Sequence, residues 1–139
     1  MMISSKGKYA VRVLAQLASD GGQGEFVALK QIAQKQQISL KYSESIMARL
    51  SKAGFVEAAS GRGGGYRLTK APSQYSLSEI LRAAEDTIEP VSCGGGAHCE
   101  NYKSCCTFPI WNELGELISN FLDSKTLADV AANISEEYK

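Results

Sequence analysis

The chain has 139 residues, of which 44% are hydrophobic and 22% charged. This length holds one ordinary domain with an extension and excludes a large multidomain enzyme, and the composition is typical of a folded protein rather than a disordered one. No stretch approaches the roughly 18–20 uninterrupted apolar residues of a membrane helix, and the first residues lack a signal pattern. We therefore expect a cytoplasmic protein with no membrane partner.

The charges are unevenly distributed although the net charge is zero. Residues 1–70 contain eleven Lys and Arg against four acidic residues, a balance of +7, and the remaining residues carry −7. A basic half joined to an acidic half indicates that the first half binds a polyanion while the second has another task. Chance segregation of solvated surface charges is the alternative.

Two helices are predicted in the first forty residues. From Lys8 to Ser19 apolar residues recur at three- and four-residue steps, with Arg12 and Gln16 off the apolar face. The residues that follow, Asp20-Gly21-Gly22, are expected to stop this helix. A shorter helix is expected over about Leu29–Gln36.

A third helix, about Leu40–Ala53, carries more information, and Ser39 is placed to cap it. At about 100° per residue, one side is expected to face the core: Tyr42, Ile46, Leu50 and Ala53. The other side has small, polar or basic residues, as a helix entering a major groove requires: Lys41, Glu44, Ser45, Ala48 and Lys52. Two short helices, a tight turn and this helix predict a helix-turn-helix, although ordinary surface helices share the pattern.

A β-hairpin, or wing, is predicted next, with strands at about 54–59 and 66–69 and a turn at 60–65. The turn surrounds Arg62 with four glycines, whose backbone can adopt positive φ and approach another molecule closely. A single cation presented in this way suits a narrow, electronegative minor groove. A phosphate-binding loop is the alternative, but no Gly-Lys-Ser/Thr follows and the next element is a strand.

The second half begins with a capping box, Ser76-Leu77-Ser78-Glu79, that opens a fourth helix, which Glu89-Pro90 should end. Beyond Pro109 we expect a long helix, a break at 123–126 and a final short turn. The long helix has a broad apolar face: Trp111, Leu114, Leu117, Ile118, Phe121 and Leu122. This face either packs on its copy in a twofold homodimer or is covered by the chain's own first and fourth helices.

All four cysteines, Cys93, Cys99, Cys105 and Cys106, lie in one glycine-rich segment. Because cytoplasmic thiols are normally reduced, we read them as metal ligands or redox thiols. Zinc sites usually begin with two cysteines separated by two residues, whereas wider spacing suits an iron–sulfur cluster, either 2Fe-2S or 4Fe-4S. Four free thiols remain an alternative. Cys106 or His98 is the candidate fourth ligand, and Glu85 and Glu89 are weaker ones.

Four features together resemble the IscR-type family of bacterial winged helix-turn-helix transcription regulators. They are Lys6-Gly7-Lys8-Tyr9-Ala10-Val11, Ile38-Ser39-Leu40, the wing from Gly61 to Leu68, and the three evenly spaced cysteines. The resemblance implies a homodimer that binds a palindromic operator, with the long helix as dimer interface and a cluster setting DNA affinity. It also implies that Glu44 tunes base choice and that Arg62 enters the minor groove. Two positions depart from the family, since Phe108 and Lys8 stand where its members have the fourth cluster ligand.

The expected fold is therefore mainly α with a small β-hairpin wing. Residues 1–72 would form a winged helix-turn-helix DNA-binding domain, and residues 73–139 a helix, a cluster-binding loop and a dimerisation helix. The expected DNA-binding residues are Ser39, Lys41, Tyr42, Glu44, Ser45, Arg49, Arg62 and Gly63.

The sequence predicts a DNA-binding regulator, a repressor, controlled by an iron–sulfur cluster on Cys93, Cys99 and Cys105, and not an enzyme. A regulator that senses through thiols without a cluster, or that is linked to cysteine metabolism, is the alternative.

Overall fold

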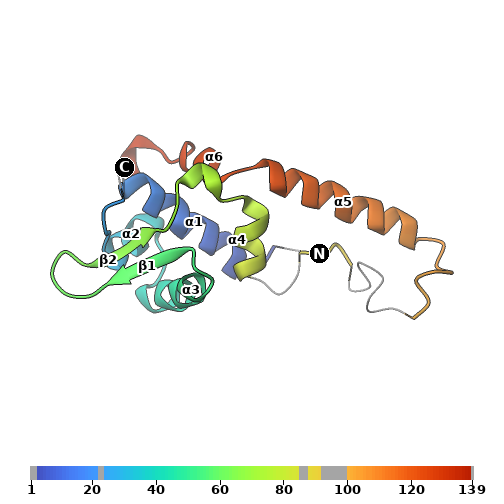
Figure 1. Cartoon of the computed structure of the whole chain (residues 1–139), viewed down its shortest axis with the longest axis horizontal. Coiled ribbons are helices and arrows are strands. Elements are labelled where there is room, and N and C mark those ends of the chain that lie inside the picture. Colours follow the sequence, from blue (N-terminus) through green and yellow to red (C-terminus); the bar gives the residue numbers. More distant parts are fainter. Residues whose placement is uncertain (1–2, 22–23, 85–87, 92–99, 139) are drawn as a thin grey trace.

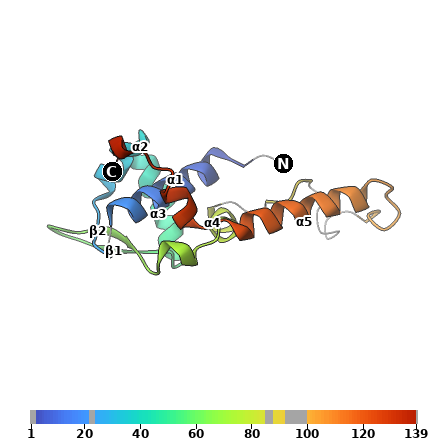
Figure 2. The same cartoon turned by 90° about the horizontal axis from the view of Figure 1, so that it is seen from above.

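The computed structural model describes residues 3–21, 24–84, 88–91 and 100–138. It has a helical head from which one long helix, α5, projects (Figures 1 and 2). The elements in chain order are α1 (Ser5–Asp20), α2 (Leu29–Gln36), α3 (Leu40–Lys52), β1 (Val56–Ala59), β2 (Gly65–Leu68), the 3₁₀ turn η1 (Pro72–Gln74), α4 (Leu77–Ala84), α5 (Phe108–Ser124), α6 (Leu127–Ala131) and the 3₁₀ turn η3 (Glu136–Tyr138). The mainly helical fold with a two-stranded hairpin is as predicted.

Helix α1 is the centre of the head. It begins at the N-cap Ser4, whose hydroxyl accepts a hydrogen bond from the Gly7 amide at 3.2 Å, and it packs against α2, α3, α4 and α6. Its predicted apolar face supplies the core, together with residues of the helices around it. The largest fully buried apolar side chains are Leu14, Leu17, Ile32, Met47, Leu50, Tyr75, Ile80 and Leu127.

One prediction for α1 is wrong, because Gln16 is completely buried rather than off the core-facing side. Its amide nitrogen donates to Asp20 at 2.9 Å, and its carbonyl oxygen accepts from Gln36 at 2.7 Å. A buried amide is tolerated when its donor and acceptor are both paired. Gln16 therefore joins α1 to α2 through polar contacts.

Helices α2 and α3 form the predicted helix-turn-helix. The turn passes through Gln37, which has left-handed backbone geometry with φ 56°, and Ser39 caps α3 by accepting from the Tyr42 amide at 3.1 Å. Ile46 and Leu50 face the core as expected. Ala53 does not, because α3 ends at Lys52 and Ala53 is its exposed C-cap.

The wing pairs β1 with β2 antiparallel, from Val56 opposite Leu68 to Ala59 opposite Gly65. The first strand begins two residues later than predicted, at Val56. The backbone at Val27 also forms an isolated antiparallel bridge with Tyr66 of β2. Gly65 makes this contact possible, because a Cβ atom there would lie 2.1 Å from the Val27 carbonyl oxygen.

Helix α5 begins at Phe108, slightly before its predicted start, and its C-terminal end joins the head. At that joint residues 125–127 run beside residues 75–77: the Leu77 amide donates to the Lys125 oxygen at 2.9 Å, and the Leu127 amide donates to the Tyr75 oxygen at 3.0 Å. The predicted break before α6 is present. Within the described residues no helix is long and apolar enough to cross a membrane.

Candidate nucleic-acid interface

The outward face of α3 is exposed as the sequence predicts. Of the expected DNA-binding residues on this helix, Lys41, Glu44, Ser45 and Arg49 are exposed. They are held there because Ile46, Met47 and Leu50, on the opposite side of the helix, are buried in the core. This burial fixes the rotation of α3 about its own axis, so the polar residues face away from the head.

Tyr42 is half-buried, between the exposed Lys41 and the buried Ser43. Its ring meets the Tyr9 ring edge-on, with centroids 5.6 Å apart and planes at 85°, an arrangement favoured by the charge distribution of aromatic rings. Tyr42 therefore belongs both to the contact between α1 and α3 and to the edge of the candidate reading surface.

Ser39 is exposed at the start of α3, but its hydroxyl is already used as the helix cap. The hydroxyl oxygen accepts from the Tyr42 amide, and the Ser39 carbonyl oxygen accepts from the buried Ser43 hydroxyl at 3.0 Å. The Ser39 proton remains a donor for a DNA oxygen, since a hydroxyl both donates and accepts.

Sequence analysis missed the contact that holds the turn of the helix-turn-helix. The Arg12 guanidinium donates from Nε to the Gln36 side-chain oxygen at 3.0 Å and from a terminal nitrogen to the Gln36 carbonyl oxygen. It also lies 5.1 Å from the centre of the Tyr9 ring. Only its place off the apolar face of α1 signalled a role, because its partner lies 24 positions away in the chain.

The tip of the wing is open to solvent at Arg62 and Gly63. Gly61 and Gly63 have φ 88° and 76°, values that side chains with a Cβ rarely adopt. Gly64 is required for space, because a Cβ atom there would lie 2.4 Å from the Ala59 carbonyl oxygen. The shape that presents Arg62 therefore depends on the surrounding glycines.

A side-chain cluster supports the hairpin below its tip. Arg67 on β2 pairs with Glu57 on β1 at 2.5 Å, and its guanidinium carbon lies 4.5 Å from the centre of the Phe26 ring. Because the two side chains are 40% and 48% exposed, the ion pair contributes little to overall stability. Its effect is local: the ion pair links the two strands, and the contact of Arg67 with Phe26 links them to the segment before α2.

The reading helix and the wing lie together on the side of the head opposite α6 (Figure 1). Helix α3 carries Lys41, Arg49 and Lys52 against one acid, Glu44. Helix α3 is thus net basic, and residues 1–70 as a whole have a balance of +7, as expected of a domain that meets DNA phosphates.

The described cysteines, Cys105 and Cys106, are exposed just before α5. The Cys105 sulfur lies 3.3 Å from the Thr107 hydroxyl oxygen. Hydrogen bonds from the Thr107 side chain, and then from the backbones of Thr107 and Phe108, lower the pKa of the Cys105 thiol. The other expected ligands, Cys93, Cys99 and His98, lie outside the described residues.

The lowered pKa of Cys105 is compatible with a metal or cluster ligand, because the ligating form of cysteine is the thiolate. Within the part of the chain that the structure describes, no three His, Cys, Asp or Glu side chains gather into a metal site. Glu89, a weaker ligand candidate, lies beside Gly115 on α5, where an added Cβ would be 3.4 Å from its carboxylate.

A helix-turn-helix with an exposed second helix, followed by a glycine-tipped hairpin, defines a winged helix-turn-helix DNA-binding protein. Residues 3–133 match the model of the family Rrf2, described as iron-dependent transcriptional regulator. The chain belongs to the Rrf2 family of DNA-binding transcriptional regulators, which are not enzymes.

Among its relatives, the HTH-type transcriptional regulator IscR of Erwinia tasmaniensis is 36% identical over 133 residues, which cover 96% of this chain and 80% of that protein. The solved structure of CymR, the global cysteine regulator of B. subtilis, has a TM-score of 0.79 and 32% identity, covering 97% of this chain and 99% of that one. The solved structure of T. potens IscR has a TM-score of 0.75 and 32% identity, and the match covers 99% of this chain and 95% of that one. The predicted family and fold are therefore confirmed.

Proposed function

We propose that the chain is a homodimeric repressor that reads a palindromic operator with α3 and the wing, and that the cysteine segment controls its affinity. The observation that carries this proposal is that the polar residues of α3 and Arg62 are exposed, while α3 and the wing lie on one side of the head. Lys41 and Ser45 would contact phosphates or base edges, and Glu44 would accept a hydrogen bond from cytosine.

The wing supports the proposal through the chemistry of Arg62 and Gly63. A glycine backbone lets the tip come close to the sugar–phosphate walls, and the guanidinium is attracted to the narrow minor groove of A·T-rich DNA. Arg62 would therefore add affinity beside the palindrome, where α3 does not reach.

The test is binding to an operator selected from random duplexes. Arg62→Ala should weaken binding and reduce the preference for A·T pairs flanking the palindrome. Affinity of the unchanged protein should fall steeply with salt, at a slope of about −0.9 per phosphate contacted. Unchanged binding by the variant would remove the wing from the mechanism, and a complex insensitive to salt would contradict the proposed surface.

The apolar face of α5 supports a homodimer. Its large side chains Ile110, Trp111, Leu114, Leu117 and Phe121 are 39% to 61% exposed, although α5 does pack on the head near Leu122. A second copy crossing α5 would cover them and set the spacing of two reading heads, which must match about 34–36 Å for successive major grooves.

The cysteine segment supports control by an iron–sulfur cluster. Cys93, Cys99 and Cys105 would hold it, with Cys106 or His98 as fourth ligand, and the Thr107 hydrogen bonds, which lower the pKa of Cys105, would favour its ligating form. When bound, the cluster would supply chemistry that responds to iron, oxidants or nitric oxide. The residues around it would then hold the loop before α5 in one arrangement.

A second candidate, a thiol-based regulator without a cluster, is favoured by the exposure of the adjacent Cys105 and Cys106 and the lowered pKa of Cys105. The similarity to CymR, named a cysteine regulator, points the same way. The absorption spectrum of anaerobically purified protein separates the two. Brown protein whose operator affinity changes when iron is removed supports the cluster, and colourless protein with full affinity supports the thiols.

A further inference from the structure

Tyr75 lies at the base of the wing and is completely buried. Its hydroxyl donates to the Phe55 carbonyl oxygen at 2.7 Å and accepts from the backbone amides of Thr69 at 3.0 Å and Lys70 at 3.2 Å. Phe55 immediately precedes β1, and Thr69 and Lys70 immediately follow β2. One side chain thus binds both legs of the hairpin where they enter the head.

The Thr69 hydroxyl oxygen also lies 3.2 Å from the phenol oxygen. The full hydrogen-bonding capacity of the phenol, one donor and two acceptor positions, is therefore in use. Beside these bonds the wing has one backbone bond at this level, from the Thr69 amide to the Phe55 oxygen at 3.3 Å. The Tyr75 hydroxyl therefore adds a hydrogen-bonded link between the two legs of the hairpin just beyond the last strand pair.

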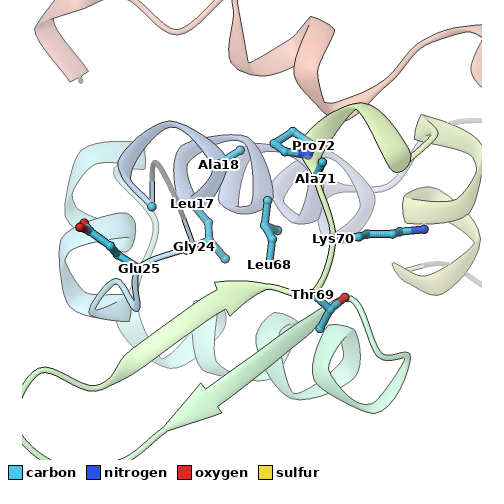
Figure 3. A pocket seen from close by; sticks show the side chains of 10 residues that line it. Leu17, Ala18, Gly24, Glu25, Leu68, Thr69, Lys70, Ala71 and Pro72 are labelled. Carbon is cyan, nitrogen blue, oxygen red and sulfur yellow. The ribbon is translucent and has the colours of Figure 1, made fainter.

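The segment that follows β2 is also held by the Thr69 hydroxyl, which donates to the Gly54 carbonyl oxygen at 2.8 Å, and by the Ala71 amide, which donates to the Gln74 side-chain oxygen at 3.0 Å. Residues 68–72 run along a groove of about 290 Å³, whose other wall includes Leu17 and Ala18 of α1 (Figure 3). On this side, space rather than packed side chains borders the segment. The buried phenol therefore restrains this segment together with the Thr69 hydroxyl, and it is the one of the two that comes from outside the hairpin.

Tyr75 is also bound to the segment between α5 and α6 and packs against Phe55. Its carbonyl oxygen accepts from the Leu127 amide at 3.0 Å, where α5 turns into α6, and its ring meets the Phe55 ring edge-on at 5.7 Å. The base of the wing and the end of the long helix are therefore connected through a single residue.

The structure assigns Tyr75 as the positioning residue that holds the wing in the orientation from which Arg62 reaches DNA. This assignment rests on the proposed contact of Arg62 with the minor groove. A conservative change can distinguish this role from a contribution to the stability of the head. Tyr75→Phe keeps the buried ring and removes only the hydroxyl.

The first experiment measures amide hydrogen exchange of the full-length free protein. Tyr75→Phe should speed exchange several-fold at residues 57–67, which lie outside the hydrogen bonds of the phenol. The matched control is Ile80→Val, a fully buried change in α4 away from the wing, and both variants should lower Tm by roughly 3–5 °C. Unchanged exchange in the wing, or equal acceleration in the control, would overturn the assignment.

The second experiment is a double-mutant cycle on the selected operator. Tyr75→Phe should weaken binding roughly three- to tenfold when Arg62 is present and by less than about twofold in Arg62→Ala protein, since the two residues act through one contact. An equal loss in both backgrounds would overturn the assignment. Faster exchange in the wing combined with full affinity of Arg62→Ala would support Tyr75 as the residue that positions the wing and reject the proposed Arg62 contact.

Discussion

Leu117 is the sharpest test of the proposed dimer, because it lies midway along α5 with 61% of its surface exposed. Complete burial of a leucine side chain contributes about 1.5–3 kcal/mol, so covering the part still exposed would contribute about 1–2 kcal/mol per copy. Twofold symmetry doubles this to about 2–4 kcal/mol. Leu117→Ala should therefore weaken the dimer roughly 30- to 700-fold, toward the lower end because alanine keeps the Cβ atom.

Sedimentation velocity over a concentration series measures the dimer Kd directly. The matched control is Leu40→Ala, which removes the same atoms from a side chain that is 42% exposed at the start of α3. The control should dimerise like the unchanged protein. A Kd for Leu117→Ala within twofold of the unchanged value would refute the assignment of this face. If the unchanged protein is a monomer at every concentration, the dimer itself is refuted.

Three further changes test the wing, the reading helix and the thiol. Gly65→Ala should cost about 2–4 kcal/mol in urea denaturation, because a Cβ atom there would meet the Val27 carbonyl oxygen; an unchanged midpoint would contradict this. Glu44→Ala should relax discrimination at one base pair by about 1–3 kcal/mol, and selection of the same site with the same stringency would remove Glu44 from base reading. Thr107→Val should raise the pKa of Cys105, since the Thr107 hydroxyl lowers it. In metal-free protein alkylation of Cys105 near pH 7, followed by mass spectrometry, should then slow, with the difference vanishing at high pH; equal rates at pH 7 would exclude the role of Thr107.

Local patterns predicted the helices well. The periodicity of α1 and α2, the cap at Ser39 and the capping box of α4 all depend on residues within four positions of one another. The glycine cluster likewise predicted the wing, because positive φ at Gly61 and Gly63 is a property of those positions alone.

Long-range contacts could not be predicted in this way. Gln16 looked like a surface residue because its partner Gln36 lies 20 positions away. The role of Tyr75 depends on contacts with Phe55 and Leu127, which are too far away in the sequence for a local pattern to reveal. For the cysteine segment, spacing and resemblance suggested a ligand set, while Cys93, Cys99 and His98 lie outside the described residues and stay predictions.

Within one chain, the start of α5 and helix α3 lie in different parts of the molecule (Figures 1 and 2). If the proposed function holds, substitutions around Cys105 and Cys106 would change the chemical signal that the protein detects without changing the side chains that face the bases. In the proposed regulator, DNA recognition and signal detection could then diverge separately after gene duplication, so the same operator sequence could come to respond to a different signal.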